Sequence, residues 1–104
     1  MTSVIALASC GVSGTYVNND TTIVLDDGVA TITTVGELTG ITLTAKASYE
    51  ITETDEGRSI TFTYTDGDKG ILGAFFDGTK SFNQGSDDSG KYIEISGIKY
   101  YKQS

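Results

Sequence analysis

The sequence contains no histidine, no proline and no tryptophan, and it has one cysteine. Without histidine, the chain lacks the commonest general base and a common metal ligand. A single cysteine excludes a disulfide within the chain. Basic residues are also scarce, with 7 Lys and Arg against 14 Asp and Glu, which gives a formal net charge of −7. Such a surface repels nucleic acid phosphates, so the sequence predicts no nucleic-acid binding.

Motifs for catalysis are missing as well. The chain has no nucleophile elbow of the Gly-x-Ser-x-Gly type and no phosphate-binding loop. Its paired carboxylates all fall in expected turns, namely Asp26/Asp27, Asp55/Glu56, Asp66/Asp68 and Asp87/Asp88. Acid–base catalysis needs a carboxylate in a cleft, which an exposed turn does not supply. The sequence therefore predicts no enzyme, no cofactor and no metal site.

The chain of 104 residues is long enough for one hydrophobic core, and we expect a single domain over residues 11–104. Threonine is frequent and there are 13 glycines. Threonine and tyrosine favour half-exposed strands, whereas glycine favours the tight turns between them. The composition is therefore typical of an all-β protein.

Alternation of apolar and polar residues supports this interpretation. From Ile41 to Ile51, and again from Ile60 to Tyr64, every second residue is apolar, a period that predicts strands with one buried face. Further strands are expected at Thr15–Val17, Thr21–Leu25, Val29–Val35, Lys91–Ile95 and Ile98–Lys102, with the last two joined by a turn at Ser96-Gly97. Asp26-Asp27-Gly28 is a hairpin signal, and the polar stretch Asn83–Gly90 is interpreted as a flexible loop.

Seven or eight short strands joined by local turns predict a small up-and-down antiparallel β-barrel. A two-sheet β-sandwich is the alternative. The sequential hairpins and the lack of a long return connection favour the barrel.

The N-terminal segment has two interpretations. Leu7-Ala8-Ser9-Cys10 follows an apolar stretch and resembles a bacterial lipobox, in which the signal peptide is cut before a lipid-bearing cysteine. In that case the mature protein begins at Cys10 and is held by acyl chains, since no stretch is long enough to cross a bilayer. Alternatively, Ser3–Ser9 forms a first strand. The lipobox predicts an extracytoplasmic protein, either lipid-anchored or secreted.

Several motifs together resemble the small lipocalin-like domains of bacterial lipoproteins. They are the lipobox, Gly14-Thr15-Tyr16, the hairpin of residues 25–32 and the closing segment of residues 90–95. Tyr16 stands where lipocalins usually carry a tryptophan. The resemblance implies a tethered barrel in the periplasm or at the cell surface.

Two groups of residues are candidates for binding a ligand or partner. The first is the segment Gly70–Gly78, which is apolar and breaks the alternation, with Ile71, Leu72, Phe75 and Phe76 as its large side chains. It is either a buried plug at one end of the barrel or a contact patch. The second is the pair Tyr100 and Tyr101, which point to opposite faces of a strand.

These observations predict a non-enzymatic binding module that holds an apolar small molecule or a component of the cell envelope. The alternative is a structural subunit of a surface layer, filament or phage particle. Such a homo-oligomer would assemble by adding the strand of residues 1–9 to a neighbour's sheet.

Overall fold

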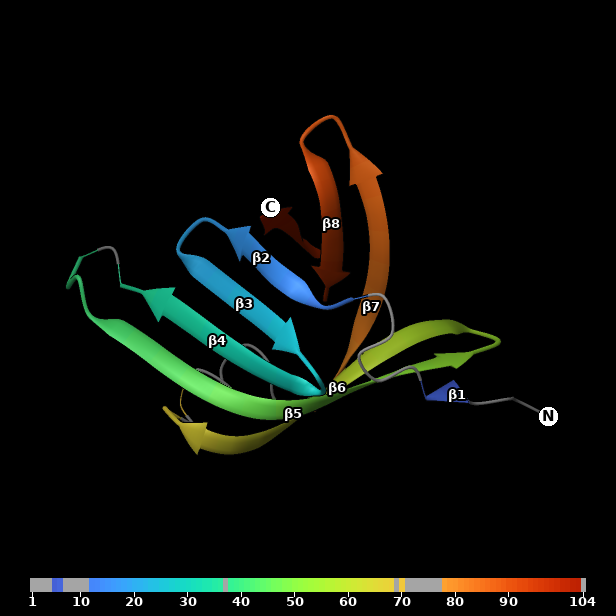
Figure 1. Cartoon of the computed structure of the whole chain (residues 1–104), viewed down its shortest axis with the longest axis horizontal. Coiled ribbons are helices and arrows are strands. Elements are labelled where there is room, and N and C mark those ends of the chain that lie inside the picture. Colours follow the sequence, from blue (N-terminus) through green and yellow to red (C-terminus); the bar gives the residue numbers. More distant parts are fainter. Residues whose placement is uncertain (1–4, 7–11, 37, 69, 71–77, 104) are drawn as a thin grey trace.

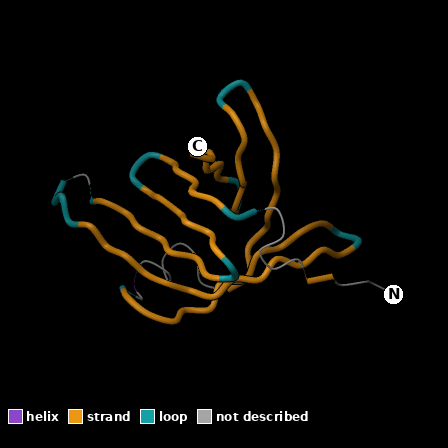
Figure 2. Tube along the Cα trace, in the orientation of Figure 1, coloured by secondary structure: helices purple, strands orange, loops and turns teal. Residues whose placement is uncertain are grey.

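The computed structural model describes residues 5–6, 12–36, 38–68, 70 and 78–103, and this part of the chain is all-β (Figures 1 and 2). Its strands are β1 (Ile5–Ala6), β2 (Gly14–Asn18), β3 (Thr21–Asp26), β4 (Val29–Val35), β5 (Thr42–Thr54), β6 (Gly57–Gly67), β7 (Gly78–Asp87), β8 (Gly90–Ile95) and β9 (Ile98–Gln103).

Strands β2 to β9 form a closed antiparallel barrel of eight strands. Each strand pairs with the next in sequence, and β9 returns to pair with β2, with Thr15 opposite Gln103 and Val17 opposite Tyr101. The predicted up-and-down barrel is thereby confirmed in preference to the sandwich.

Tight turns join the strands where the sequence predicted them. Asp27 and Gly28 have φ angles of 50° and 80°, and Ser96 and Gly97 have 53° and 83°. Positive φ at both central residues is the type I′ geometry, whose twist matches that of the flanking strands.

The barrel interior is filled by side chains from all eight strands. Alternate residues are buried, so each strand presents one face to the interior and one to solvent. The buried hydrophobic residues are Val12, Tyr16, Ile23, Leu25, Ala30, Ile32, Ala45, Ala47, Tyr49, Ile51, Ile60, Phe62, Phe82, Ile93, Ile95 and Tyr100. An eight-stranded barrel has an interior just wide enough for such side chains, and the aromatic rings among them occupy much of it.

The β5–β6 hairpin is longer than the barrel wall that it belongs to. Strand β4 pairs with β5 only as far as Ser48, so Glu50–Thr54 extends beyond it. Along this extension β1 pairs with β5, with Ile5 opposite Glu53 and Ala6 opposite Thr52. In Figure 1 this hairpin points to the right and the β7–β8 hairpin points upward.

The expectation of a flexible loop at Asn83–Gly90 is wrong. Strand β7 continues through Asp87, and Gly85 lies opposite Tyr92 of β8. A Cβ atom at position 85 would lie 2.6 Å from the Tyr92 hydroxyl, so the tyrosine side chain packs directly against the glycine backbone. Polar residues form a strand here because a cross-strand aromatic ring covers them.

Candidate functional site

The β5–β6 and β7–β8 hairpins both lie at one end of the barrel. The turns β3–β4, β5–β6 and β7–β8 lie at this end, because consecutive strands run in opposite directions. The inward-facing side chains change from apolar to polar at this end: Glu53 follows Ile51 on the inner face of β5, and Gln84 follows Phe82 on that of β7. The apolar interior therefore ends in a polar rim at this mouth of the barrel.

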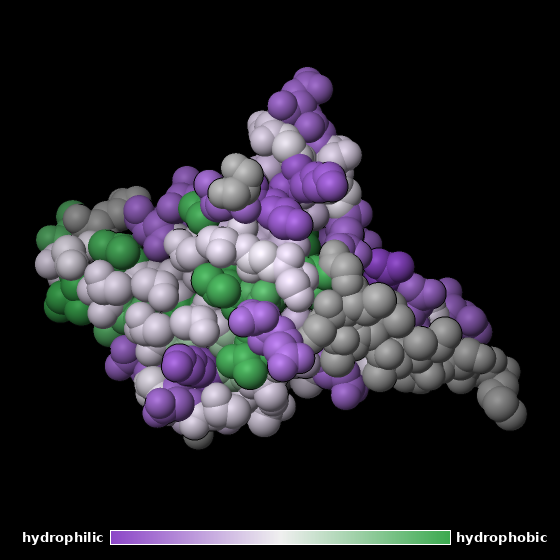
Figure 3. Space-filling view, in the orientation of Figure 1, coloured by the Kyte–Doolittle hydropathy of each residue, from purple (hydrophilic) through white to green (hydrophobic). Residues whose placement is uncertain are grey.

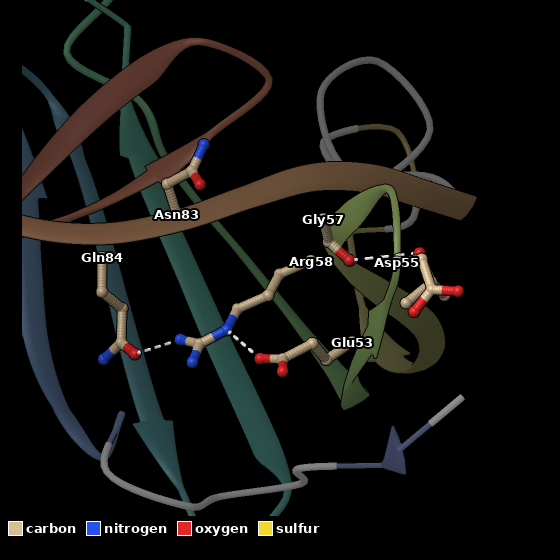
Figure 4. Close-up of a pocket in the computed structure, with 7 residues that line it drawn as sticks. Glu53, Asp55, Gly57, Arg58, Asn83 and Gln84 are labelled. Atoms are coloured by element: carbon tan, nitrogen blue, oxygen red, sulfur yellow. Dashed lines mark hydrogen bonds and ion pairs between the residues drawn. The ribbon is translucent and has the colours of Figure 1, made fainter. Parts of the chain in front are cut away.

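Arg58 connects the two hairpins. Its Nε donates a hydrogen bond to Glu53 Oε2 at 2.7 Å, and its Nη1 donates to Gln84 Oε1 at 3.0 Å. Glu53 and Arg58 are direct cross-strand partners in β5 and β6. Figure 4 shows Arg58 reaching from the β5–β6 hairpin to Gln84, while Asn83 points to the other side of β7. Two acceptors from different strands thus set the direction of the guanidinium.

These residues line an open pocket of about 460 Å³, called the mouth pocket below. Its lining residues are Glu53, Thr54, Asp55, Gly57, Arg58, Asn83 and Gln84. The Arg58 and Glu53 side chains are 39% and 42% exposed. An ion pair this exposed contributes about 1 kcal/mol or less to stability, so its main effect is to orient the guanidinium.

A second group of polar side chains lies on the outer face of β7, β8 and β9. We call it the tyrosine cluster, and it consists of Asp87, Tyr92, Lys99 and Tyr101. Asp87 Oδ2 accepts hydrogen bonds from the Tyr101 hydroxyl at 2.9 Å and from Lys99 Nζ at 3.3 Å. The Tyr92 and Tyr101 rings meet edge to face at 5.8 Å, and Lys99 Nζ lies 4.6 Å from the centre of the Tyr92 ring. Asp87, Lys99 and Tyr101 are thus joined by hydrogen bonds, and the Tyr92 ring packs against Tyr101 and Lys99.

The hydrogen bonds of the tyrosine cluster also shift its pKa values. The backbone N–H of Ser89, followed by the Tyr101 hydroxyl, lowers the pKa of Asp87. The hydrogen bond to Asp87 raises the pKa of Lys99 and that of Tyr101. All three groups therefore keep their ordinary charge at neutral pH, which is the behaviour of a structural network.

The structure separates the two tyrosines that the sequence singled out. Tyr100 is a core residue with 6% exposure, and burial raises the pKa of its hydroxyl. Tyr101 lies on the outer face, within the tyrosine cluster. Of the two predicted tyrosines, only Tyr101 therefore has its hydroxyl on the surface. The other predicted residues, Cys10, Ile71, Leu72, Phe75 and Phe76, lie outside the described residues.

Apolar side chains gather at the opposite end of the barrel. The β4–β5 hairpin exposes Val35, Leu38, Ile41 and Leu43, with Leu38 completely exposed. Figure 3 shows this apolar tip as the green area at the left edge of the molecule, where the hairpin lies in Figure 1. It is far along the barrel from the mouth pocket.

Sequence reasoning missed the mouth pocket. Glu53 and Arg58 lie at equal distances from the turn residues Asp55 and Glu56, so their opposite charges were a signal for pairing across the hairpin. Gln84 lay in the stretch interpreted as a loop, and nothing local places it beside Arg58. Among the described residues, no group of three or more His, Cys, Asp or Glu side chains could hold a metal ion.

Comparison of the chain with protein-family models, with curated proteins and with solved structures finds no match. Within the described part of the chain, no helix is long and apolar enough to cross a membrane.

Proposed function

We propose that this protein is a non-enzymatic binding module of the cell envelope, anchored through a lipid on Cys10, that recognises an envelope component at its mouth pocket. The observation that carries the proposal is the position of Arg58, which Glu53 and Gln84 hold in an open pocket. A cationic fork with a preset direction loses little entropy on binding and is typical of recognition sites.

Between the two ligand classes that the sequence suggests, the filled interior favours the envelope component. The inward-facing aromatic residues Tyr16, Tyr49, Phe62, Phe82 and Tyr100 are each at most 6% exposed. An apolar small molecule inside the barrel would have to displace these rings. A component bound at the rim leaves the core intact.

A non-enzymatic role fits the ionisable groups that the structure describes. Asp87 has a lowered pKa and is held by Ser89 and Tyr101, so it is poorly suited to donate a proton near neutral pH. In the mouth pocket the Glu53 carboxylate is paired with Arg58. The lowered pKa of Asp87 is the opposite of the raised pKa that a general acid needs.

Mass spectrometry of protein purified from its own host tests the proposal. We expect a chain that begins at Cys10 with acyl groups on its sulfur, and a co-purifying ligand that is lost in Arg58→Ala. Lys91→Ala is the matched control, because it removes one positive charge from an exposed position outside the pocket. An unmodified Cys10 that still follows residues 1–9 would contradict the anchor. A ligand retained equally by both variants would contradict the site.

A second candidate function is the structural subunit, and the pairing of β1 with β5 favours it. This pairing shows that the β5 edge beyond β4 accepts an added antiparallel strand. If a neighbouring copy supplies that strand, light scattering will show a mass that rises with concentration and falls to the monomer when residues 1–9 are deleted. A monomer at all concentrations would exclude this assembly.

A further inference from the structure

We infer that the mouth pocket binds a neutral, hydroxyl-rich ligand, namely a saccharide chain. This inference rests on the proposed function and adds the chemical class of the ligand. It follows from the charge, the polarity and the hydrogen-bonding groups of the pocket.

The charge of the pocket disfavours ions of either sign. Glu53 and Asp55 contribute two negative charges and Arg58 one positive charge, so the lining has a formal charge of −1. An anion attracted to the guanidinium would also meet the Glu53 carboxylate that is already paired with it. A cation would compete with Arg58 for Glu53, whose carboxylate is already 2.7 Å from Nε. A neutral ligand meets neither penalty.

The polarity of the pocket disfavours an apolar ligand. Ile51, Ile60 and Phe82 lie one inward-facing position below Glu53, Arg58 and Gln84 along their strands. Their side chains are 0–1% exposed, so they offer no surface for hydrophobic contact. The side chains of the rim are charged or amide groups, which an apolar ligand would have to desolvate without compensation.

The hydrogen-bonding groups match hydroxyls. A guanidinium has five N–H donors, and Arg58, which lines the pocket, uses two of them in its hydrogen bonds to Glu53 and Gln84. Carboxylate oxygens of Glu53 and Asp55 accept, and an amide such as Gln84 both donates and accepts. A hydroxyl group also donates and accepts, so adjacent hydroxyls of a sugar can use neighbouring donors and acceptors together. The volume of about 460 Å³ is that of a small-ligand site, roughly 300–1,000 Å³.

The chain offers an unambiguous probe of this pocket, because Arg58 is the only arginine in the sequence. Its Nε–H therefore gives the single arginine side-chain signal in a ¹⁵N NMR spectrum. We would titrate the protein with neutral tetrasaccharides of glucose and of N-acetylglucosamine, and separately with inorganic phosphate. We expect a saturable shift of the Arg58 Nε–H and Gln84 side-chain signals with at least one tetrasaccharide and none with phosphate.

Variants link the shift to the pocket. Gln84→Ala should weaken tetrasaccharide binding roughly three- to tenfold, which is the loss of about one hydrogen bond. Gln103→Ala is the matched control, since Gln103 is an exposed amide side chain outside the pocket lining and donates to the Tyr101 carbonyl oxygen. Dispersed backbone spectra of both variants would show that they fold.

The outcomes separate this inference from the function on which it rests. A shift with phosphate but not with the sugars would overturn the saccharide and leave the pocket as a binding site. Neither probe shifting the Arg58 Nε–H signal, while protein from the host carries a ligand that Arg58→Ala loses, would also overturn the saccharide inference. The mouth pocket would remain the binding site. If Arg58→Ala also retains the host ligand, both the saccharide inference and the proposed binding site at the mouth pocket are wrong.

Discussion

At the scale of single residues, Tyr100 and Tyr101 show how a step of one position along a strand changes the role of a side chain. Tyr100 packs among the core residues, whereas Tyr101 donates a hydrogen bond to Asp87 on the outer face. The alternation of a strand produces this difference, and the closed barrel decides which face is the interior.

This difference leads to a prediction about Asp87. Replacing Tyr101 with phenylalanine removes a hydrogen bond that favours the ionised carboxylate, so we expect the pKa of Asp87 to rise toward its ordinary value of 3.8. Tyr100→Phe is the control and should leave the pKa of Asp87 unchanged, because its side chain faces the interior. A ¹³C NMR titration of the Asp87 carboxyl measures both variants.

The sign of the pH dependence follows from the same shift. Because the pKa of Asp87 is lower in the folded state, its stabilising effect is present above the ordinary carboxyl pKa and is lost as the pH falls through the lowered value. In Tyr101→Phe the pKa shift of Asp87 is smaller. The free energy of unfolding should therefore fall less on acidification than it does in the unchanged protein. An equal shift of the Asp87 pKa in both variants would contradict this account of the tyrosine cluster.

At the scale of elements, the β5–β6 hairpin carries the strongest local constraints. The register of its two strands shifts between Lys46 and Ala47, close to the end of β6 at Gly67. Gly67 has a φ of 93°, and a Cβ atom there would overlap with the carbonyl oxygen of Thr44 and lie 2.9 Å from the Ala45 Cα. The irregularity at the end of the hairpin thus depends on a glycine.

We predict that Gly67→Ala destabilises the protein more than Gly57→Ala does. Both glycines have positive φ, at 93° and 132°, but a Cβ atom at position 57 would meet nothing within 4 Å. We expect both changes to cost about 1–2 kcal/mol through backbone strain, and the overlap at Gly67 to add about 1–3 kcal/mol. Urea denaturation of the two variants gives the comparison. Equal losses in the free energy of unfolding would show that the β5 backbone at Thr44 and Ala45 shifts to accommodate the added Cβ atom without cost.

At the scale of the whole molecule, closure of the barrel depends on one strand. β9 pairs with β8 along the chain and with β2 from the other end of the sequence. Without β9 both neighbours would become exposed edges, and the core residues between them would meet solvent.

Deletion of residues 98–104 should therefore abolish the cooperative thermal transition, as measured by calorimetry. Deletion of residues 1–9 is the control: β1 lies outside the closed ring, so the transition should remain. If the chain without β9 still unfolds cooperatively, closure of the barrel is not what stabilises it.

The sequence alone was sufficient to predict most of the strands and several of the turns. Alternation placed the strands around Ile41–Ile51 and Ile60–Tyr64, and Asp27-Gly28 and Ser96-Gly97 marked hairpin turns that have the expected geometry. These features depend on neighbouring residues in the chain, whose steric preferences and periodicity act locally. Local hairpins in sequence order also favoured the barrel over the sandwich.

The tertiary structure decided the features that depend on contacts between distant residues. The pairing of Thr15 with Gln103 closes the barrel, and Arg58 of β6 donates a hydrogen bond to Gln84 of the neighbouring strand β7. Neither of these contacts has a local signal, because each partner alone is an ordinary strand or turn residue. Strand pairing in the folded barrel brings these partners together, because closure places β9 beside β2 and the register of β6 with β7 places Gln84 diagonally opposite Arg58.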